Sequence, residues 1–141
     1  MSKQEIRGLI VEAKVRGGEK AQTIVLETVD ENTKRPEVLP ATTYQLRTPL
    51  SDAPFYITIS DIVLNHGTEY ERRQPFEMFI NGKNVTHFQW ITAFTRLASA
   101  IFRKGGDIKF LIDELQSVYD PNGGYMGKGG RWIPSLVAEI G

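Results

Sequence analysis

The chain has 141 residues, about the size of one folded domain, and its 17 basic and 17 acidic side chains give a formal net charge of zero. A balanced charge provides no overall attraction to nucleic acid or to anionic lipid. Because the sequence contains no cysteine, its own residues cannot form disulfides, thiolate nucleophiles or cysteine-ligated metal sites.

The N-terminal part of the chain, over about residues 5–82, is predicted to form strands. Residues 6–15 and 21–29 are rich in β-branched and aliphatic side chains, and the glycine pair at 17–18 predicts a hairpin turn between them. The polar segment 30–34 interrupts this pattern, so we expect it to form a solvated loop.

Further strands are predicted along the next segment. Prolines at both ends of residues 35–40 allow only an extended or edge segment there. Residues 43–48 alternate in polarity, and residues 55–59 are strong β-formers throughout. Residues 75–80 are expected to pair with residues 55–59, which leaves the charged stretch 61–74 as a long hairpin connection.

The pattern then changes to helical periodicity. Thr86 and Gln89 match a capping box, in which each side chain serves a backbone N–H at the helix start, and this predicts a helix over residues 87–103. We expect Trp90 and Phe94 to pack in the core rather than to form an exposed stripe for a partner. The apolar positions at helical spacing are Trp90, Ile91, Phe94, Leu97, Ala98, Ile101 and Phe102.

Two more helices are predicted towards the end of the chain. Asp107 is the expected N-cap of a helix over residues 107–119. Pro134 suits the first turn of a third helix over residues 134–140. The predicted fold class is therefore α+β, with an antiparallel, β-rich N-terminal half packed against two to three C-terminal α-helices in a single domain over residues 1–141.

The sequence carries no membrane signal. No apolar stretch approaches the roughly 20 residues that a membrane span needs. The first residues are polar and lack the apolar run of a signal peptide. We therefore expect a cytoplasmic protein with no membrane contact.

The glycine-rich segment 123–131 has some features of a phosphate-binding loop. It precedes a predicted helix, and backbone N–H groups at a helix N-terminus attract anions. The P-loop pattern fails, however, because Asn122 replaces its first glycine and Gly129 replaces the Ser or Thr that binds magnesium. We favour a mobile connector and keep a phosphate cradle as the alternative.

No other side chains match a catalytic or metal-binding pattern. His66 and His87 are the only histidines, and neither has an acidic or histidine partner at ligand spacing. The basic pairs at 72–73 and 103–104 could contact phosphates, but a solvated face and a helix C-terminus explain them better. Reasoning from the residues alone ends at an α+β domain without a recognisable active site.

Several stretches between residues 34 and 141, taken in their order and spacing, carry a family resemblance. They are Arg35-Pro-Glu-Val-Leu-Pro40, Thr43-Tyr44, Pro75-Phe-Glu-Met-Phe-Ile80, Trp90, Thr95-Arg96-Leu97, Ser99-Ala-Ile-Phe-Arg-Lys-Gly-Gly-Asp107, Val118-Tyr-Asp-Pro-Asn-Gly-Gly-Tyr125, Gly129-Gly130 and Pro134-Ser-Leu-Val-Ala-Glu-Ile-Gly141. Together they resemble the TSCPD domain, which is found at the C-terminal end of adenosylcobalamin-dependent (class II) ribonucleotide reductases and in stand-alone proteins. The tail is similar to the separate accessory chain, or b component, of split class II reductases.

The sequence departs from this family at the motif that names it. The domain is named for a Thr-Ser-Cys-Pro-Asp run, and this sequence has Arg131-Trp-Ile-Pro-Ser135 at the corresponding place. A metal site formed by the family's cysteines therefore does not carry over. Accessory chains of this type also continue into a cysteine-bearing tail, and no such tail falls within these 141 residues.

The resemblance implies a non-catalytic accessory domain of a class II ribonucleotide reductase. Such a domain would support deoxyribonucleotide synthesis, and with it DNA replication, by docking on the catalytic chain. We expect no activity from this chain alone and no cofactor on it, because adenosylcobalamin would bind the partner chain. The candidate interface or ligand residues are Arg35, Glu37, Arg47, Arg96, Asp120, Gly124, Tyr125 and Lys128.

Two other classes of function stay open. One is a regulatory module that binds a small molecule or nucleotide through the glycine-rich segment. The other is a nucleic-acid-binding protein that uses the basic pairs, which the zero net charge disfavours. A homo-oligomer is an open alternative for the assembly.

Overall fold

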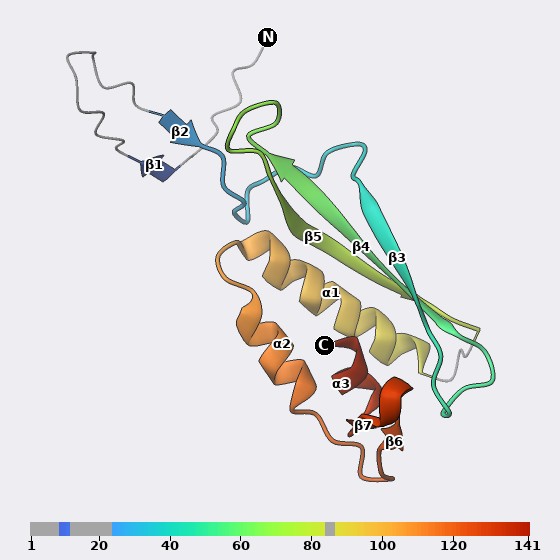
Figure 1. The fold of residues 1–141 in the computed structure, drawn as a ribbon. Coiled ribbons are helices and arrows are strands. Elements are labelled where there is room, and N and C mark those ends of the chain that lie inside the picture. The colour runs from blue at the N-terminus through green and yellow to red at the C-terminus, as the bar shows by residue number, and fades with distance from the viewer. Residues whose placement is uncertain (1–8, 12–23, 84–86) are drawn as a thin grey trace.

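A computed structural model shows an α+β fold, as the sequence predicts. An antiparallel sheet lies in the N-terminal half, and helices follow in the C-terminal half (Figure 1). None of the helices in the described part of the chain is long and apolar enough to cross a membrane. The described residues are 9–11, 24–83 and 87–141.

The central sheet has three strands in the order β3-β4-β5. They are β3 (Ala41–Leu46), β4 (Phe55–Leu64) and β5 (Arg72–Asn81). The middle strand, β4, pairs antiparallel with both neighbours, which confirms the predicted pairing of residues 55–59 with residues 75–80. Both β3 and β5 are edge strands of this sheet within the described residues.

The connection predicted for residues 61–74 is wrong at both ends, because residues 61–64 and 72–74 belong to strands and only residues 65–71 connect them. The β4–β5 ladder continues past a β-bulge and ends only at the pair of Leu64 with Arg72. Ile62 and Leu64 are both buried, so apolar contacts stabilise this extension despite the charged residues around it. The charged residues of this stretch indicated a loop, but burial of its apolar side chains on one face of the sheet maintains the β4–β5 ladder.

The other N-terminal strands are short. Strands β1 (Leu9–Val11) and β2 (Ile24–Leu26) pair antiparallel with each other. The glycine turn predicted at 17–18 lies outside the described residues. Residues 35–40 form no strand and lead as an irregular segment into β3, in keeping with the prolines at both ends.

Three helices form near the predicted places, but the third begins at Leu136 with Ser135 as its N-cap, so Pro134 lies before the helix and not in its first turn. The first begins after His87, which occupies the N-cap position without a side-chain cap, while Thr86 lies outside the described residues. The helices are α1 (Phe88–Lys104), α2 (Lys109–Gln116) and α3 (Leu136–Ile140).

The second helix is shorter than predicted at both ends. Asp107 is not its N-cap, because Ile108 occupies that position. The Asp107 carboxylate nevertheless accepts a hydrogen bond from the Lys109 N–H at 2.9 Å, so it still serves a backbone donor at the helix start. The helix ends at Gln116, and the predicted last turn to residue 119 is irregular.

The glycine-rich segment, for which a mobile connector is predicted, instead forms a short hairpin. Strands β6 (Tyr125–Met126) and β7 (Trp132–Ile133) pair antiparallel, and a short 3₁₀ turn at Lys128–Gly130 joins them. The Gly127 N–H donates to the Arg131 carbonyl at 2.8 Å and closes the turn. Its glycines let the chain reverse within a few residues.

Apolar side chains gather in two core clusters. The larger one joins the sheet to α1, and partly buried residues from α2 and α3, among them Leu111 and Ile140, pack against it. The smaller one contains Phe76, which is only 1% exposed. The buried members are Ile57, Met78, Ala98 and Phe102 in the larger cluster and Val29, Ile62, Leu64 and Phe76 in the smaller.

Part of the predicted α1 stripe lies outside this core. Trp90 is 68% exposed and Leu97 is 67% exposed, so the prediction that Trp90 packs in the core is wrong. Phe94 is partly buried against the larger cluster, in keeping with its predicted role. The apolar stripe of α1 is wider than the surface that the sheet covers, and the residues of the helix that are buried are Thr95, Ala98, Ser99 and Phe102.

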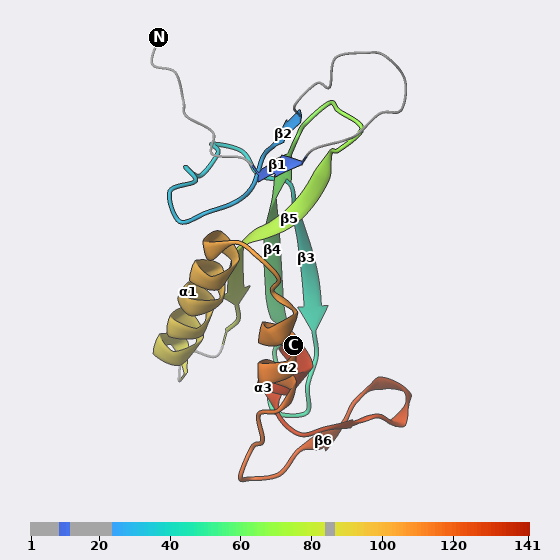
Figure 2. The ribbon, with the colours of Figure 1, turned by 90° about the vertical axis from the view of Figure 1, so that its left-hand side faces the viewer.

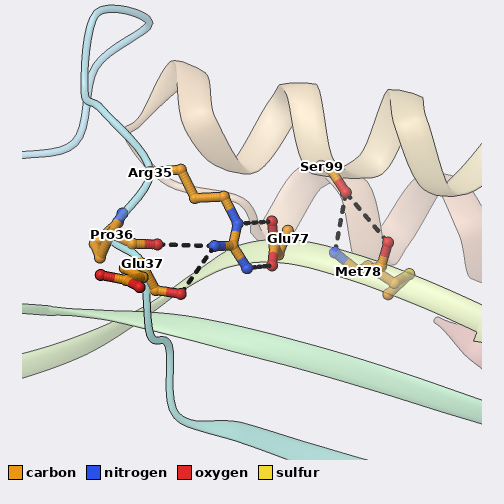
Figure 3. A network of polar contacts seen from close by, with 6 residues as sticks. All are labelled: Arg35, Pro36, Glu37, Glu77, Met78 and Ser99. Atoms are coloured by element: carbon orange, nitrogen blue, oxygen red, sulfur yellow. Dashed lines mark hydrogen bonds and ion pairs between the residues drawn. The ribbon is translucent and has the colours of Figure 1, made fainter.

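Helix α1 runs alongside the edge strand β5 (Figure 1 and Figure 2), and Ser99 joins the two (Figure 3). The Ser99 hydroxyl accepts a hydrogen bond from the Met78 N–H at 2.9 Å and donates one to the Met78 carbonyl at 3.3 Å. Among the described strands β5 pairs only with β4, so these two backbone groups would otherwise have no strand partner.

Replacing Ser99 with alanine should therefore destabilise the fold. Ser99→Ala leaves a buried N–H and a buried carbonyl without partners, and we expect the free energy of unfolding in a urea titration to fall by about 1–3 kcal/mol. Thr92→Ala, at an exposed position of the same helix, is the matched control and should cost less than about 0.5 kcal/mol. Equal effects of the two variants would show that Ser99 does not hold β5.

Candidate functional site

The eight residues singled out from the sequence do not converge on one site. Arg35 and Glu37 lie together beside β5, whereas Arg47 follows β3 and Arg96 lies exposed on α1. The other four belong to the C-terminal turn and hairpin, and they are Asp120, Gly124, Tyr125 and Lys128.

The Arg35 guanidinium anchors the segment before β3 to β5 (Figure 3). Its Nε and Nη2 donate to the two carboxylate oxygens of Glu77 at 3.0 and 2.8 Å. Its Nη1 donates to the carbonyls of Pro36 and Glu37 at 2.8 and 3.4 Å. The hydrogen bond with Glu77 raises the pKa of Arg35, so the guanidinium stays charged. These contacts make Arg35 an anchor of the segment that leads into β3.

Asp120 and Gly124 shape the turn that leads into the C-terminal hairpin. The Asp120 carboxylate accepts from the Asn122 N–H at 2.8 Å, and the Asp120 N–H donates to the Pro134 carbonyl at 3.0 Å. At Gly124 an added Cβ would lie 2.1 Å from the Ile133 carbonyl oxygen, closer than any side chain tolerates. Both positions therefore serve the fold.

Tyr125 and Ser135 attach the hairpin and α3 to the rest of the C-terminal region. Tyr125 is 7% exposed, and its hydroxyl donates to the Glu139 carboxylate. Burial and this hydrogen bond raise the pKa of Tyr125 well above its usual value, so it is neutral near pH 7 and unsuited to proton transfer there. The Ser135 hydroxyl accepts from the Ala138 N–H at 3.0 Å and donates to the Val118 carbonyl at 2.7 Å.

An apolar pocket of about 220 Å³ lies where the end of β5, the start of α1 and α3 meet. Reasoning from the sequence missed this pocket, because only the fold brings α3 to the start of α1. The exposed side chain of Trp90 forms part of its wall. Other residues that line it are Ile80, His87, Phe94, Leu136 and Ile140.

A second, polar pocket of about 480 Å³ lies at the other side of the same sheet end. Arg47 lines it and is the one sequence-derived candidate that does so. Lys83, Tyr56 and Asn81 join Arg47 there, and none of them was singled out from the sequence because their convergence depends on strand pairing. The pocket combines positive charge with hydrogen-bonding groups.

The histidines do not form a metal site in the described residues. His66, contrary to expectation, has an acidic neighbour, since its Nδ1 lies 3.1 Å from a carboxylate oxygen of Glu71. The Gly67 N–H also donates to that carboxylate, and this hydrogen bond lowers the pKa of Glu71. Over residues 9–11, 24–83 and 87–141 no group of three or more His, Cys, Asp or Glu is placed to hold a metal ion.

The model of the TSCPD domain family matches residues 27–141, which include the sheet, all three helices and the C-terminal hairpin. The chain belongs to the TSCPD domain family. No curated protein and no solved structure matches the chain. In this TSCPD domain, Trp132 and Ile133 form β7, and Ser135 is the N-cap of α3.

The raised pKa of Tyr125 predicts a specific loss of stability at alkaline pH. An acid whose pKa is raised by folding stabilises the fold below its unfolded pKa, about 10 for tyrosine, and this contribution is lost as the pH rises towards the folded value. Above about pH 10 the free energy of unfolding of the TSCPD domain should therefore fall by up to about 1.4 kcal/mol for each pH unit. The Tyr125→Phe variant should not show this additional fall.

Urea titrations between about pH 9 and pH 11 measure this difference. Tyr119→Phe is the control, because Tyr119 is highly exposed and should leave the alkaline slope unchanged. If Tyr125→Phe keeps the slope of the unmodified protein, Tyr125 is not held neutral by its surroundings.

Proposed function

We propose that this TSCPD domain is a non-catalytic accessory domain of an adenosylcobalamin-dependent (class II) ribonucleotide reductase. It would support deoxyribonucleotide synthesis in the cytoplasm by docking on the catalytic chain. The observation that carries the proposal is the family match over residues 27–141, since TSCPD domains are found in ribonucleotide reductase-related proteins.

The side-chain chemistry of the domain agrees with an accessory role. Class II reduction uses a thiyl radical on the catalytic chain and a cysteine pair that delivers electrons. This sequence contains no cysteine, so it supplies neither the radical site nor the electron-delivering pair. Adenosylcobalamin and the reacting thiols would belong to the partner chain.

The apolar pocket and its rim are the docking surface that fits this role best. Trp90 is both largely exposed and part of the pocket wall, an arrangement typical of the anchors that dominate protein interfaces. Leu97 lies two turns further along α1 and is equally exposed. Large exposed apolar side chains grouped on one surface mark an interaction site rather than a solvated face.

We predict that the domain co-purifies with the catalytic chain of a split class II reductase and that Trp90 contributes strongly to binding. Trp90→Ser should weaken binding by about 30-fold or more, the effect of losing an interface anchor of about 2 kcal/mol. Trp132→Ser is the matched control, since Trp132 is 58% exposed but does not line the pocket.

Binding is measured by titrating the catalytic chain against each variant, with urea unfolding to verify that both variants fold. Absence of binding by the unmodified domain would refute the accessory role. If the two variants weaken binding equally, Trp90 is not the anchor of the docking surface. The nucleic-acid alternative gains no support from the charge of the chain, since its formal net charge is zero.

We also propose that the domain binds no metal tightly, because it lacks cysteine and its histidines stand singly rather than in clusters. Elemental analysis of the purified protein should find zinc and iron well below one atom per chain. A stoichiometric amount of either metal that survives dialysis would contradict this and would reopen a catalytic role.

A further inference from the structure

The polar pocket lies where three strand ends meet. Arg47 directly follows β3, Tyr56 is the second residue of β4, and Lys83 follows the end of β5 by two residues. Gln45, Tyr56 and Asn81 form one cross-strand row in the register of the sheet. The pocket volume of about 480 Å³ is typical of small-ligand sites.

The charges of the pocket favour an anion. Arg47 and Lys83 are cationic, and Asp52 contributes the opposing carboxylate, so one positive charge remains in excess. Within residues 9–11, 24–83 and 87–141, neither Arg47 nor Lys83 has an ion-pair partner. Arg35, in contrast, is fully engaged by Glu77 and by backbone carbonyls.

The pocket also presents neutral donors and a ring. The Gln45 amide donates to the Tyr56 hydroxyl oxygen at 3.1 Å, which leaves the Tyr56 O–H free to donate to a ligand. The Tyr56 side chain is partly exposed beside the pocket, and its ring offers a flat apolar surface. The Asn81 amide adds a further donor and acceptor.

The frame of the pocket is held by hydrogen bonds that do not involve its cations. In the turn between β3 and β4 the Leu50 N–H donates to the Thr48 hydroxyl at 3.1 Å, and the Ser51 hydroxyl donates to the Ala53 carbonyl at 2.8 Å. Thr48 is buried. Substituting Arg47 or Lys83 therefore leaves the frame intact, which allows the site to be tested without unfolding it.

We propose that this pocket binds a small phosphorylated ligand. Arg47 and Lys83 contact the phosphate, the Tyr56 hydroxyl donates to it or to a neighbouring oxygen, and the Tyr56 ring contacts the sugar or base. The Asp52 carboxylate accepts a hydrogen bond from a ligand hydroxyl. This site is separate from the glycine-rich segment and from the apolar pocket, so ligand binding does not depend on the proposed docking.

Isothermal titration of the full chain with ADP and with ribose 5-phosphate tests the proposal. We expect at least one of them to bind, and adenosine, which lacks phosphate, to show no binding under the same conditions. Arg47→Gln and Lys83→Gln should each weaken binding by about tenfold or more, as expected for a lost charge-assisted hydrogen bond. The affinity of the unmodified domain should fall as salt is added. The relative affinities of the two probes assign the ligand to nucleotides or to sugar phosphates.

Arg72→Gln and Lys109→Gln are the matched controls, because both residues are exposed and lie outside the pocket. The proposal is overturned if neither phosphorylated probe binds at millimolar concentration, or if the control substitutions weaken binding as much as the pocket substitutions. These titrations use the domain without a partner, so their failure is distinct from a failure to bind a reductase.

Discussion

The structure depends on how the backbone of one edge strand is satisfied. A sheet of three strands has two open edges, and each open edge exposes N–H and carbonyl groups that need partners. Along β5 the partner is a side chain, Ser99 of α1, which bonds both groups of Met78 (Figure 3). A helix that approaches an edge this closely must bring small residues to the contact, and Ala98 and Ser99 fulfil that requirement.

The packing of α1 against β5 determines which side chains remain exposed and available for binding. Trp90 and Leu97 remain outside the core because they lie on a different face of the helix from its buried residues, which are Thr95, Ala98, Ser99 and Phe102. The start of α1 then meets α3, and the space between them stays open as the apolar pocket. The same sheet end leaves Arg47 and Lys83 unpaired among the described residues on its other side. Two surfaces of different chemistry thus arise from one packing arrangement.

The sequence predicted the fold well where local patterns and burial agree. The β4–β5 pairing and the positions of the three helices follow from alternation, apolar spacing and glycines. It failed where tertiary contact overrides local pattern. The β4–β5 ladder continues through a charged stretch as far as the pair of Leu64 with Arg72, and Trp90 has the spacing of a core residue but remains exposed. The polar pocket was only partly predictable, because Arg47 meets Lys83 through strand register alone.

The second open edge of the sheet has a consequence for self-association. Strand β3 is six residues long, carries no charged side chain and pairs only with β4 among the described strands. Such an edge attracts other extended chains and promotes aggregation when it is long. Pro40 precedes β3 and Pro49 follows it closely, and neither has an N–H to offer to a further strand. The prolines therefore limit any added ladder to the six residues of β3.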